Sequence, residues 1–280
     1  MTRFILLAAL AVFALGANVA FGGSPEQDRQ DFVNYYTERF PDVPVDDFIN
    51  GMYTQVDDEW RARWEEGEDF PNYLVDLDEG ETLFHQEFAN GNSLADCFAG
   101  YEDGIRQNYP YFDGERGEVI TIEYAINLCR EENGEEPLPY KKGKIAQISA
   151  YLANLSNGKT IAVSVPEDNP AAMEWYERGK SHFYSPRGQL DMACADCHYD
   201  YAGHRVRTQV LSPALGHPSH FPVYRKKWTG LGTMHRRFAG CNEQVRAKAF
   251  PAQSDEYRAL EYFLNVMSNG LAVNAPATRP

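Results

Sequence analysis

The chain has 280 residues, a net charge of −15, and 43% hydrophobic and 24% charged residues. This length suggests two domains, and the composition excludes a disordered chain, a collagen or a multispanning membrane protein. The negative charge argues against nucleic acid as the main partner, because phosphate binding needs a basic surface. Residues 201–250, however, carry nine Lys or Arg and one acid, which gives +8 there and leaves −23 for the rest. That basic region suggests an anionic ligand or an acidic partner, although a solvated basic face explains the charge equally well.

The first 22 residues have the features of a secretory signal peptide. Arg3 precedes the apolar run Phe4–Leu15, and Ala20-Phe21-Gly22 fits a small-x-small cleavage site. The run is shorter than the ~20 residues that span a bilayer, and no later stretch is long enough either. We therefore expect an exported mature protein without a membrane span, in an oxidising compartment that permits disulfides. An uncleaved anchor is the alternative.

The segment Cys194-Ala195-Asp196-Cys197-His198 is a C-x-x-C-H motif, the attachment signature of c-type haem. Two thiols one helical turn apart can form thioethers to the two vinyl groups, and the histidine can then bind the iron. A redox or zinc site is the alternative, but zinc would need a second pair of ligands at similar spacing, which is missing. We therefore predict one covalent haem c on Cys194 and Cys197, with His198 as the proximal ligand.

An internal repeat links this motif to an earlier segment. Leu94-Ala95-Asp96-Cys97-Phe98 matches the motif at three of five positions, but Leu and Phe replace the first cysteine and the iron ligand. Further on, Tyr151–Gly158 matches Phe263–Gly270 at an offset of 112 in the numbering. The chain therefore resembles two cytochrome-like units, of which the first has lost its haem site.

The same offset places Cys129 on Cys241. From this repeat we predict a mainly α-helical fold with two tandem cytochrome c-like domains. The first, residues 23–160, carries no haem, and the second, residues 161–280, carries the covalent haem.

The repeat also predicts a disulfide. In the haemless unit, Cys97 stands at an attachment position and Cys129 at a position across from the missing iron. Without haem these places can approach each other, so we predict a Cys97–Cys129 bond, which closes a loop of ~30 residues and adds a few kcal/mol if unstrained. Cys241 remains unpaired, and an odd cysteine in a secreted protein marks a reactive thiol or an intermolecular bond.

Helical patterns frame the second unit. Asp168–Lys180, with Asp168 as the N-cap and Gly179 at the end, is expected to open it, and Ser254–Ser268 to close it. Lys144–Leu155 is the matching closing helix of the first unit. Residues 201–240 are rich in Gly, Pro and His, so we expect a loop around the haem. Asp28–Trp64 contains amphipathic helical pieces.

Four residues are candidates for the sixth iron ligand. Met267 is expected in the core of the closing helix, and Met234 and His235 lie in the predicted loop. Cys241 is the fourth candidate. Basic residues flank it, and nearby cations lower the pKa of a thiol and favour the thiolate, which is both a nucleophile and a metal ligand. The same cations could hold a small dianion beside the sulfur.

Taken together, these features resemble the SoxA family of periplasmic sulfur-oxidising cytochromes over essentially the whole mature chain. The most specific segment is Phe238-Ala239-Gly240-Cys241-Asn242-x-x-Val245-Arg246-Ala247, and Asn127-Leu128-Cys129-Arg130 supports it. Some family members carry two haems. This chain departs from them at Leu94 and Phe98, so it resembles the single-haem branch.

The resemblance implies a partner, a substrate and a reaction. Family members pair with the cytochrome SoxX and couple thiosulfate oxidatively to a cysteine of the SoxYZ carrier, with a cytochrome c as electron acceptor. This is L-cysteine S-thiosulfotransferase activity. By resemblance, His198 and Cys241 are the axial ligands, Cys241 is also catalytic, and Arg237 binds the substrate. Arg246 and Lys248 are further substrate-binding candidates from charge and proximity.

Two other functions are compatible with the sequence. One is a plain electron-transfer cytochrome subunit without a substrate site, and the other is a non-catalytic structural subunit of a larger redox complex. The first predicts Met or His ligation of the iron and no modification of Cys241, and the second predicts no loss of activity when Cys241 is replaced.

Overall fold

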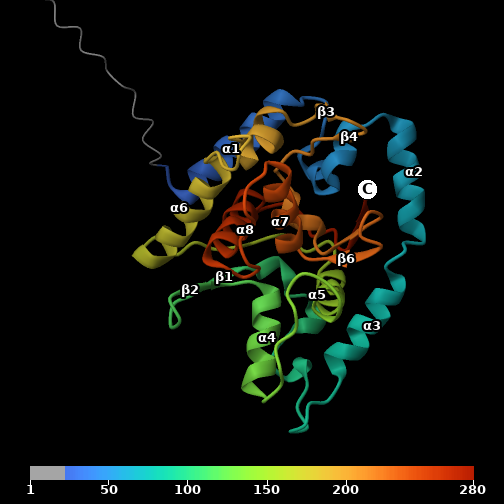
Figure 1. Cartoon of the computed structure of the whole chain (residues 1–280), viewed down its shortest axis with the longest axis vertical. Helices are drawn as coiled ribbons and strands as arrows, with labels where there is room; N and C mark the ends of the chain where they lie inside the picture. The colour runs from blue at the N-terminus through green and yellow to red at the C-terminus, as the bar shows by residue number, and fades with distance from the viewer. Residues whose placement is uncertain (1–22) are drawn as a thin grey trace, which may run out of the picture.

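The computed structural model describes residues 23–280, and the predicted signal peptide, residues 1–22, lies outside them. The described chain is mainly helical (Figure 1). Its α-helices are α1 Pro25–Arg39, α2 Asp58–Asp69, α3 Leu74–His85, α4 Ile122–Glu132, α5 Lys144–Leu155, α6 Pro170–Tyr184, α7 Met234–Gln244 and α8 Asp255–Met267. Within residues 23–280, no helix has both the length and the apolar character needed to cross a membrane.

Short helical turns and strands connect these helices. The 3₁₀ segments are Val45–Gln55, Leu94–Asp96, Tyr101–Asp103, Arg106–Asn108 and His217–His220, and Asp196–Asp200 is a π-helical turn. The strands are β1 Tyr111–Asp113, β2 Glu118–Ile120, β3 Arg205–Val206, β4 Gln209–Val210, β5 Val223–Arg225, β6 Gly230–Gly232 and β7 Ala277–Arg279. Three antiparallel hairpins, β1–β2, β3–β4 and β5–β6, account for six strands, and β7 adds to β5 in parallel.

The second half of the chain repeats the elements of the first half. The bounds of β5, β6 and α7 follow those of β1, β2 and α4 at the same offset of 112, and the end of α8 follows that of α5 in the same way. In each half an opening helix packs against a closing helix, α3 on α5 and α6 on α8. The matched order supports the proposal of two tandem cytochrome c-like units.

A glycine permits the same helix crossing in both units. A Cβ atom on Gly80 of α3 would lie 2.2 Å from the Gln147 carbonyl oxygen, and one on Gly179 of α6 would lie 2.0 Å from that of Ala259. Gln147 and Ala259 correspond to each other at the offset of 112. Because no Cβ fits at these distances, both positions require glycine. Gly179 therefore serves the crossing and does not end α6, which continues to Tyr184.

The N-terminal segment packs on the second unit. Helix α1 contacts α8, and Phe32, Tyr36 and Phe48 join the apolar core built around α6 and α8. The core of the first unit lies between α3, α4 and α5 and includes Leu94 and Phe98. The division into residues 23–160 and 161–280 remains a proposal. This packing shows that α1, although it is the first helix in sequence, lies against the second unit.

The first unit contains the disulfide that the repeat predicts. Cys97 and Cys129 are bonded, with their Cα atoms 6.1 Å apart. Leu94 is fully buried and Phe98 is 6% exposed. The two residues that replaced the thioether cysteine and the iron ligand thus fill the apolar core of this unit.

Four buried polar side chains meet where the two units join. Ser149 Oγ donates to Glu123 Oε1 at 2.8 Å, and His235 Nε2 lies 3.1 Å from Glu261 Oε2. These residues form two repeat pairs, since the offset of 112 relates Glu123 to His235 and Ser149 to Glu261. Burial, together with the nearby Glu261 carboxylate, raises the pKa of Glu123.

Two expectations about secondary structure were wrong in detail. The N-cap of α6 is Asn169, whose side chain accepts from the N–H groups of Ala171 and Ala172, whereas Asp168 was expected there. Residues 201–240 are not all loop, because they contain β3 to β6 and the first two turns of α7. The Gly-, Pro- and His-rich composition of this stretch gave no signal for α7. The helix packs against α8, which lies further along the chain.

Candidate functional site

The C-x-x-C-H motif lies in a helical turn that follows α6. The Asp196 carboxylate accepts a hydrogen bond from the backbone N–H of Ala193 at 2.8 Å, which caps the start of this turn. Cys194, Cys197 and His198 are all half-buried. The first unit has the same cap, since Asp96 accepts from the Ser93 N–H at 2.7 Å. The two units therefore share this cap, although a 3₁₀ turn follows it in the first unit and a π-helical turn in the second.

The backbone around His198 fixes the orientation of its ring. Nδ1 lies 2.9 Å from the Ser212 carbonyl oxygen, which can only accept, so Nδ1 is the donor. The Tyr36 hydroxyl donates to the carbonyl oxygen of His198 at 2.5 Å. This leaves Nε2 as the nitrogen able to bind a metal, the arrangement typical of a histidine ligand with an ordered second partner.

Cys241 on α7 meets His198. Its half-buried thiol interacts with the imidazole by a side-chain hydrogen bond, and its charge also acts on Cys194 and Cys197. The two motif thiols, the His198 imidazole and a third thiol, that of Cys241, thus converge from two segments that are far apart in the sequence. Two thiols beside an imidazole whose Nδ1 is held by Ser212, with a third thiol hydrogen-bonded to that imidazole, fit the donor set of a c-type haem.

The thiol of Cys241 is electrostatically distinct from the motif thiols. Burial alone raises its pKa, but the Arg237 guanidinium, the hydrogen bond with His198 and the Arg225 charge outweigh this and lower the pKa to about 7. Burial raises the pKa of Cys194 to about 12. The cationic surroundings therefore favour the thiolate at Cys241, as the sequence predicted for this position.

The other three candidate ligands are engaged elsewhere. Met267 packs in the core of the second unit, and Met234 packs against Phe221 and Val223. His235 Nδ1 accepts a hydrogen bond from the Gln253 N–H at 3.0 Å, and its Nε2 faces Glu261. Among residues 23–280, Cys241 is the candidate that the structure brings to His198.

The predicted substrate-binding residues are not equivalent in space. Arg237 lies one helical turn before Cys241 on α7, is half-buried and acts directly on the thiol. Arg246 and Lys248 are exposed and follow the end of α7. The structure thus brings Arg237 to the sulfur, whereas Arg246 and Lys248 lie further along the chain.

Arg225 is a candidate that the sequence analysis missed. It lies on β5, is 9% exposed, and donates from Nε to the Pro280 carbonyl oxygen at 2.7 Å. Its charge acts on Cys241 and Arg237, while burial lowers its own pKa to about 10. One sequence signal could have found it, because the offset of 112 aligns Arg225 with Asp113, a reversal of charge between the two units.

Comparisons with known proteins agree with this site. A family model described as "SoxA/TsdA, cytochrome c domain" matches residues 79–161, which lie almost wholly in the haemless unit. The chain is 49% identical to the L-cysteine S-thiosulfotransferase subunit SoxA of Allochromatium vinosum, over the whole of both chains. It is also 49% identical to the subunit of that name from Chlorobaculum thiosulfatiphilum, over 98% of this chain and 95% of the relative. The chain belongs to the SoxA family.

A solved structure extends this result to the fold. The crystal structure of SoxXA from P. pantotrophus matches with a TM-score of 0.72 and 31% identity, and the match covers 81% of this chain and 86% of that one. SoxA proteins contain a cytochrome c domain, and a cytochrome c domain implies haem c. The mainly helical fold and the membership of the SoxA family are therefore as the sequence predicted.

Proposed function

We propose that this chain is the haem-bearing subunit of an L-cysteine S-thiosulfotransferase. It couples thiosulfate to a cysteine of the SoxYZ carrier, acts with a SoxX subunit, and passes the electrons to a cytochrome c in the periplasm. The single observation that carries the proposal is the convergence of Cys241 with His198 and Arg237. The names of the SoxA relatives and the SoxXA title of the matched structure support the partners and the reaction.

Cys194 and Cys197 would hold one haem c through thioether bonds, and His198 and Cys241 would bind its iron. The first unit holds none, because Leu94 and Phe98 have replaced two of its haem-binding residues and are packed in its core. The bound haem supplies a redox centre beside the sulfur. The Ser212 carbonyl keeps the proton of His198 on Nδ1 and so keeps Nε2 available as a ligand.

The reaction needs a sulfur relay and positive charge for the sulfonate. The carrier thiol loses a proton, its sulfur bonds to the terminal sulfur of thiosulfate, and two electrons leave to the cytochrome c acceptor. Cys241 is positioned to be the relay. Arg237 can hold the sulfonate through its planar fork of N–H donors, and the buried Arg225 adds a second charge. Arg246 and Lys248 are proposed to attract the anion from further out.

The test replaces Cys241 by alanine and measures turnover with thiosulfate and the carrier. We expect coupling to be abolished while haem stays attached, because the thioethers do not depend on this residue. A Cys97→Ala/Cys129→Ala variant is the matched control, since it changes the repeat counterpart of Cys241 and should keep its activity per folded molecule. Full turnover of Cys241→Ala would favour the electron-transfer cytochrome without a substrate site.

A second arm tests Arg237. Arg237→Ala should lower kcat/KM for thiosulfate roughly 30- to 150-fold if the side chain makes a desolvated charged hydrogen bond. This corresponds to a loss of about 2–3 kcal/mol of transition-state stabilisation. Arg237→Lys should recover only part of the loss, because lysine lacks the fork. A loss of less than twofold in Arg237→Ala would remove Arg237 from the substrate site.

A further inference from the structure

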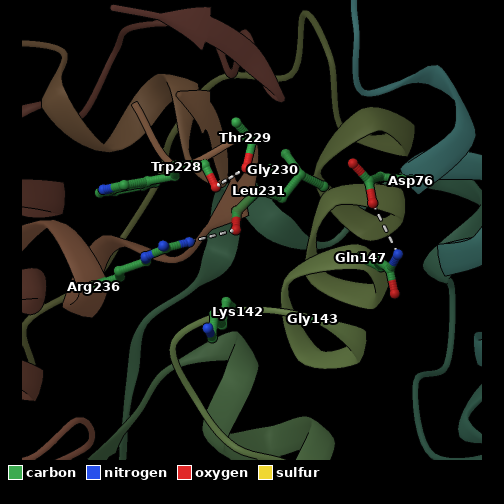
Figure 2. A pocket seen from close by; sticks show the side chains of 9 residues that line it. All are labelled: Asp76, Lys142, Gly143, Gln147, Trp228, Thr229, Gly230, Leu231 and Arg236. Carbon is green, nitrogen blue, oxygen red and sulfur yellow. Dashed lines mark hydrogen bonds between the residues drawn. The ribbon is translucent and has the colours of Figure 1, made fainter. Parts of the chain in front are cut away.

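A pocket of about 200 Å³ lies between the two units, outside the cysteine site (Figure 2). Lys142 and Gly143, at the start of α5, line it from the first unit. Arg236, on α7, and Trp228, in the turn between β5 and β6, line it from the second. Figure 2 shows Arg236 on one side of the pocket and Asp76, which accepts from Gln147, on the other.

The two cationic side chains of the pocket have no acidic partner. Arg236 donates from Nη1 to the Leu231 carbonyl oxygen at 3.1 Å, and its guanidinium lies 4.2 Å from the centre of the Trp228 ring. These contacts hold the guanidinium in place. Within the described chain, neither Arg236 nor Lys142 forms a salt bridge. Arg236 is therefore a fixed, half-buried cation at the pocket without a salt bridge, while the acidic residue of the lining, Asp76, lies on the opposite side and accepts from Gln147.

The repeat provides an internal counterpart to this pocket, on the other side of the junction. There, the Arg258 guanidinium bonds Glu118 at 2.7 Å and Asp255 at 2.9 Å, and it lies 4.9 Å from the centre of the Trp175 ring. Two carboxylates of the chain itself thus neutralise the cation.

The pocket lacks these two carboxylates. At the offset of 112, Gly230 stands in place of Glu118, and Gly143 stands in place of Asp255. A Cβ atom built on either glycine would meet no other atom within 4 Å, so the space that the acids would occupy is open. The same offset replaces Arg258 by Ala146 and Tyr124 by Arg236, so the pocket keeps one guanidinium, now on α7, but neither of the two carboxylates.

From this contrast we propose that the pocket binds an oxyanion, held by Arg236 and Lys142 in the place of the two lost carboxylates. A guanidinium and an ammonium around an open pocket suit a sulfate-like group or a carboxylate. The oxyanion comes either free from solution or as an acidic side chain of a bound protein. This site differs from the proposed substrate site at Arg237 and Cys241, although Arg236, Arg237 and Cys241 are all on α7.

Calorimetric titration with sodium sulfate, against sodium chloride at equal ionic strength, tests the proposal. The haem-loaded protein is used in an Arg237→Ala background, which weakens the proposed substrate site. Arg236→Gln should weaken sulfate binding by roughly tenfold or more, and Lys142→Gln by roughly threefold to tenfold, as expected for the loss of charge-assisted contacts. Lys142 is exposed, so Lys142→Gln keeps the test valid if Arg236→Gln fails to fold.

Gly230→Glu tests the repeat argument directly. It restores the carboxylate that Glu118 supplies in the counterpart, at a residue whose φ is outside the left-handed region, and should abolish sulfate binding. Lys159→Gln, which makes the same charge change as Lys142→Gln at an exposed lysine elsewhere, should bind sulfate as the parent does.

N-acetylglutamate amide is the second probe, since it presents a protein-like carboxylate. Binding of sulfate that depends on Arg236, Lys142 and Gly230 would support a free oxyanion. Binding of the amide alone, with the same dependence, would support an acidic side chain of a partner. Absence of binding for both probes, or binding that none of the three substitutions changes, would overturn the proposal. Because no turnover is measured, the result is independent of the proposed transferase activity.

Discussion

The two units place different side chains on the same framework. The first has Phe98, Ala125 and Asp113 where the second has His198, Arg237 and Arg225. In the first unit the phenylalanine is buried in an apolar core, and the cysteine counterpart of Cys241 is used in a disulfide. In the second unit, the corresponding positions direct an imidazole, a thiol and two guanidiniums toward one point. Where the second unit has the residues of the haem motif, the first unit thus has an apolar core and a disulfide.

This difference assigns separate tasks to the units. The first unit supports the second through the buried junction of Glu123, Ser149, His235 and Glu261. Helix α7 shows how this support reaches the site. Its His235 and Asn242 bond to residues of α8, while Arg237 and Cys241 lie toward the haem motif. A framework of this kind positions the reactive sulfur through a helix that is anchored at both ends.

Removing the disulfide should have the largest effect on stability. A Cys97→Ala/Cys129→Ala variant frees a loop with a sequence separation of 32 and should lower the free energy of unfolding by roughly 3–4 kcal/mol. Denaturant unfolding measures the loss. An unchanged denaturation midpoint would show that the stability of the first unit does not depend on the Cys97–Cys129 disulfide.

The helix crossings test whether the units are equivalent in packing. Gly80→Ala and Gly179→Ala each force a Cβ against a carbonyl oxygen and should each destabilise the protein by roughly 2–3 kcal/mol. Gly67→Ala is the control, because it lies in α2 with no atom within 4 Å of the added Cβ, and should be neutral or slightly stabilising. Thermal unfolding measures these effects. Melting temperatures of Gly80→Ala and Gly179→Ala that match that of Gly67→Ala would show that the two helix crossings do not require glycine.

The buried junction should show the smallest effect, and one that depends on pH. Burial raises the pKa of Glu123, with Glu261, Arg106, Ser149 and His235 facing it. A raised folded-state pKa favours folding at low pH, and this contribution is lost as the pH rises through that pKa. Glu123→Gln removes the titration and can still accept from Ser149. The melting temperature of Glu123→Gln, relative to that of the parent protein, should therefore rise from pH 5 to pH 8. A difference that stays constant over this range would exclude a titration of Glu123 in the folded protein.

Local patterns predicted the elements that carry them. Lys144–Leu155 is α5 with the same bounds, since its apolar spacing faces the core directly. The repeat predicted the disulfide between Cys97 and Cys129. Each of these features depends on residues close in sequence or on an offset that can be read along the chain.

Features that depend on contacts between residues distant in sequence were not predicted. Arg225 reaches Cys241 because the β5–β6 hairpin folds back onto α7. The pocket near Arg236 and the packing of α1 on α8 likewise join distant segments. The start of α7 was also missed, because the Gly-, Pro- and His-rich stretch before it gives no local helical signal. The offset of 112 contained part of this information, in the reversal of charge from Asp113 to Arg225.

We propose that the second unit binds one haem and that the first unit binds none. The most direct test is mass spectrometry of the intact mature protein, followed by mapping of its peptides under non-reducing conditions. We predict one covalent haem per chain, on the peptide with Cys194 and Cys197, together with a disulfide-linked pair of peptides that contain Cys97 and Cys129. A ratio near two, or haem on the Cys97 peptide, would contradict the account.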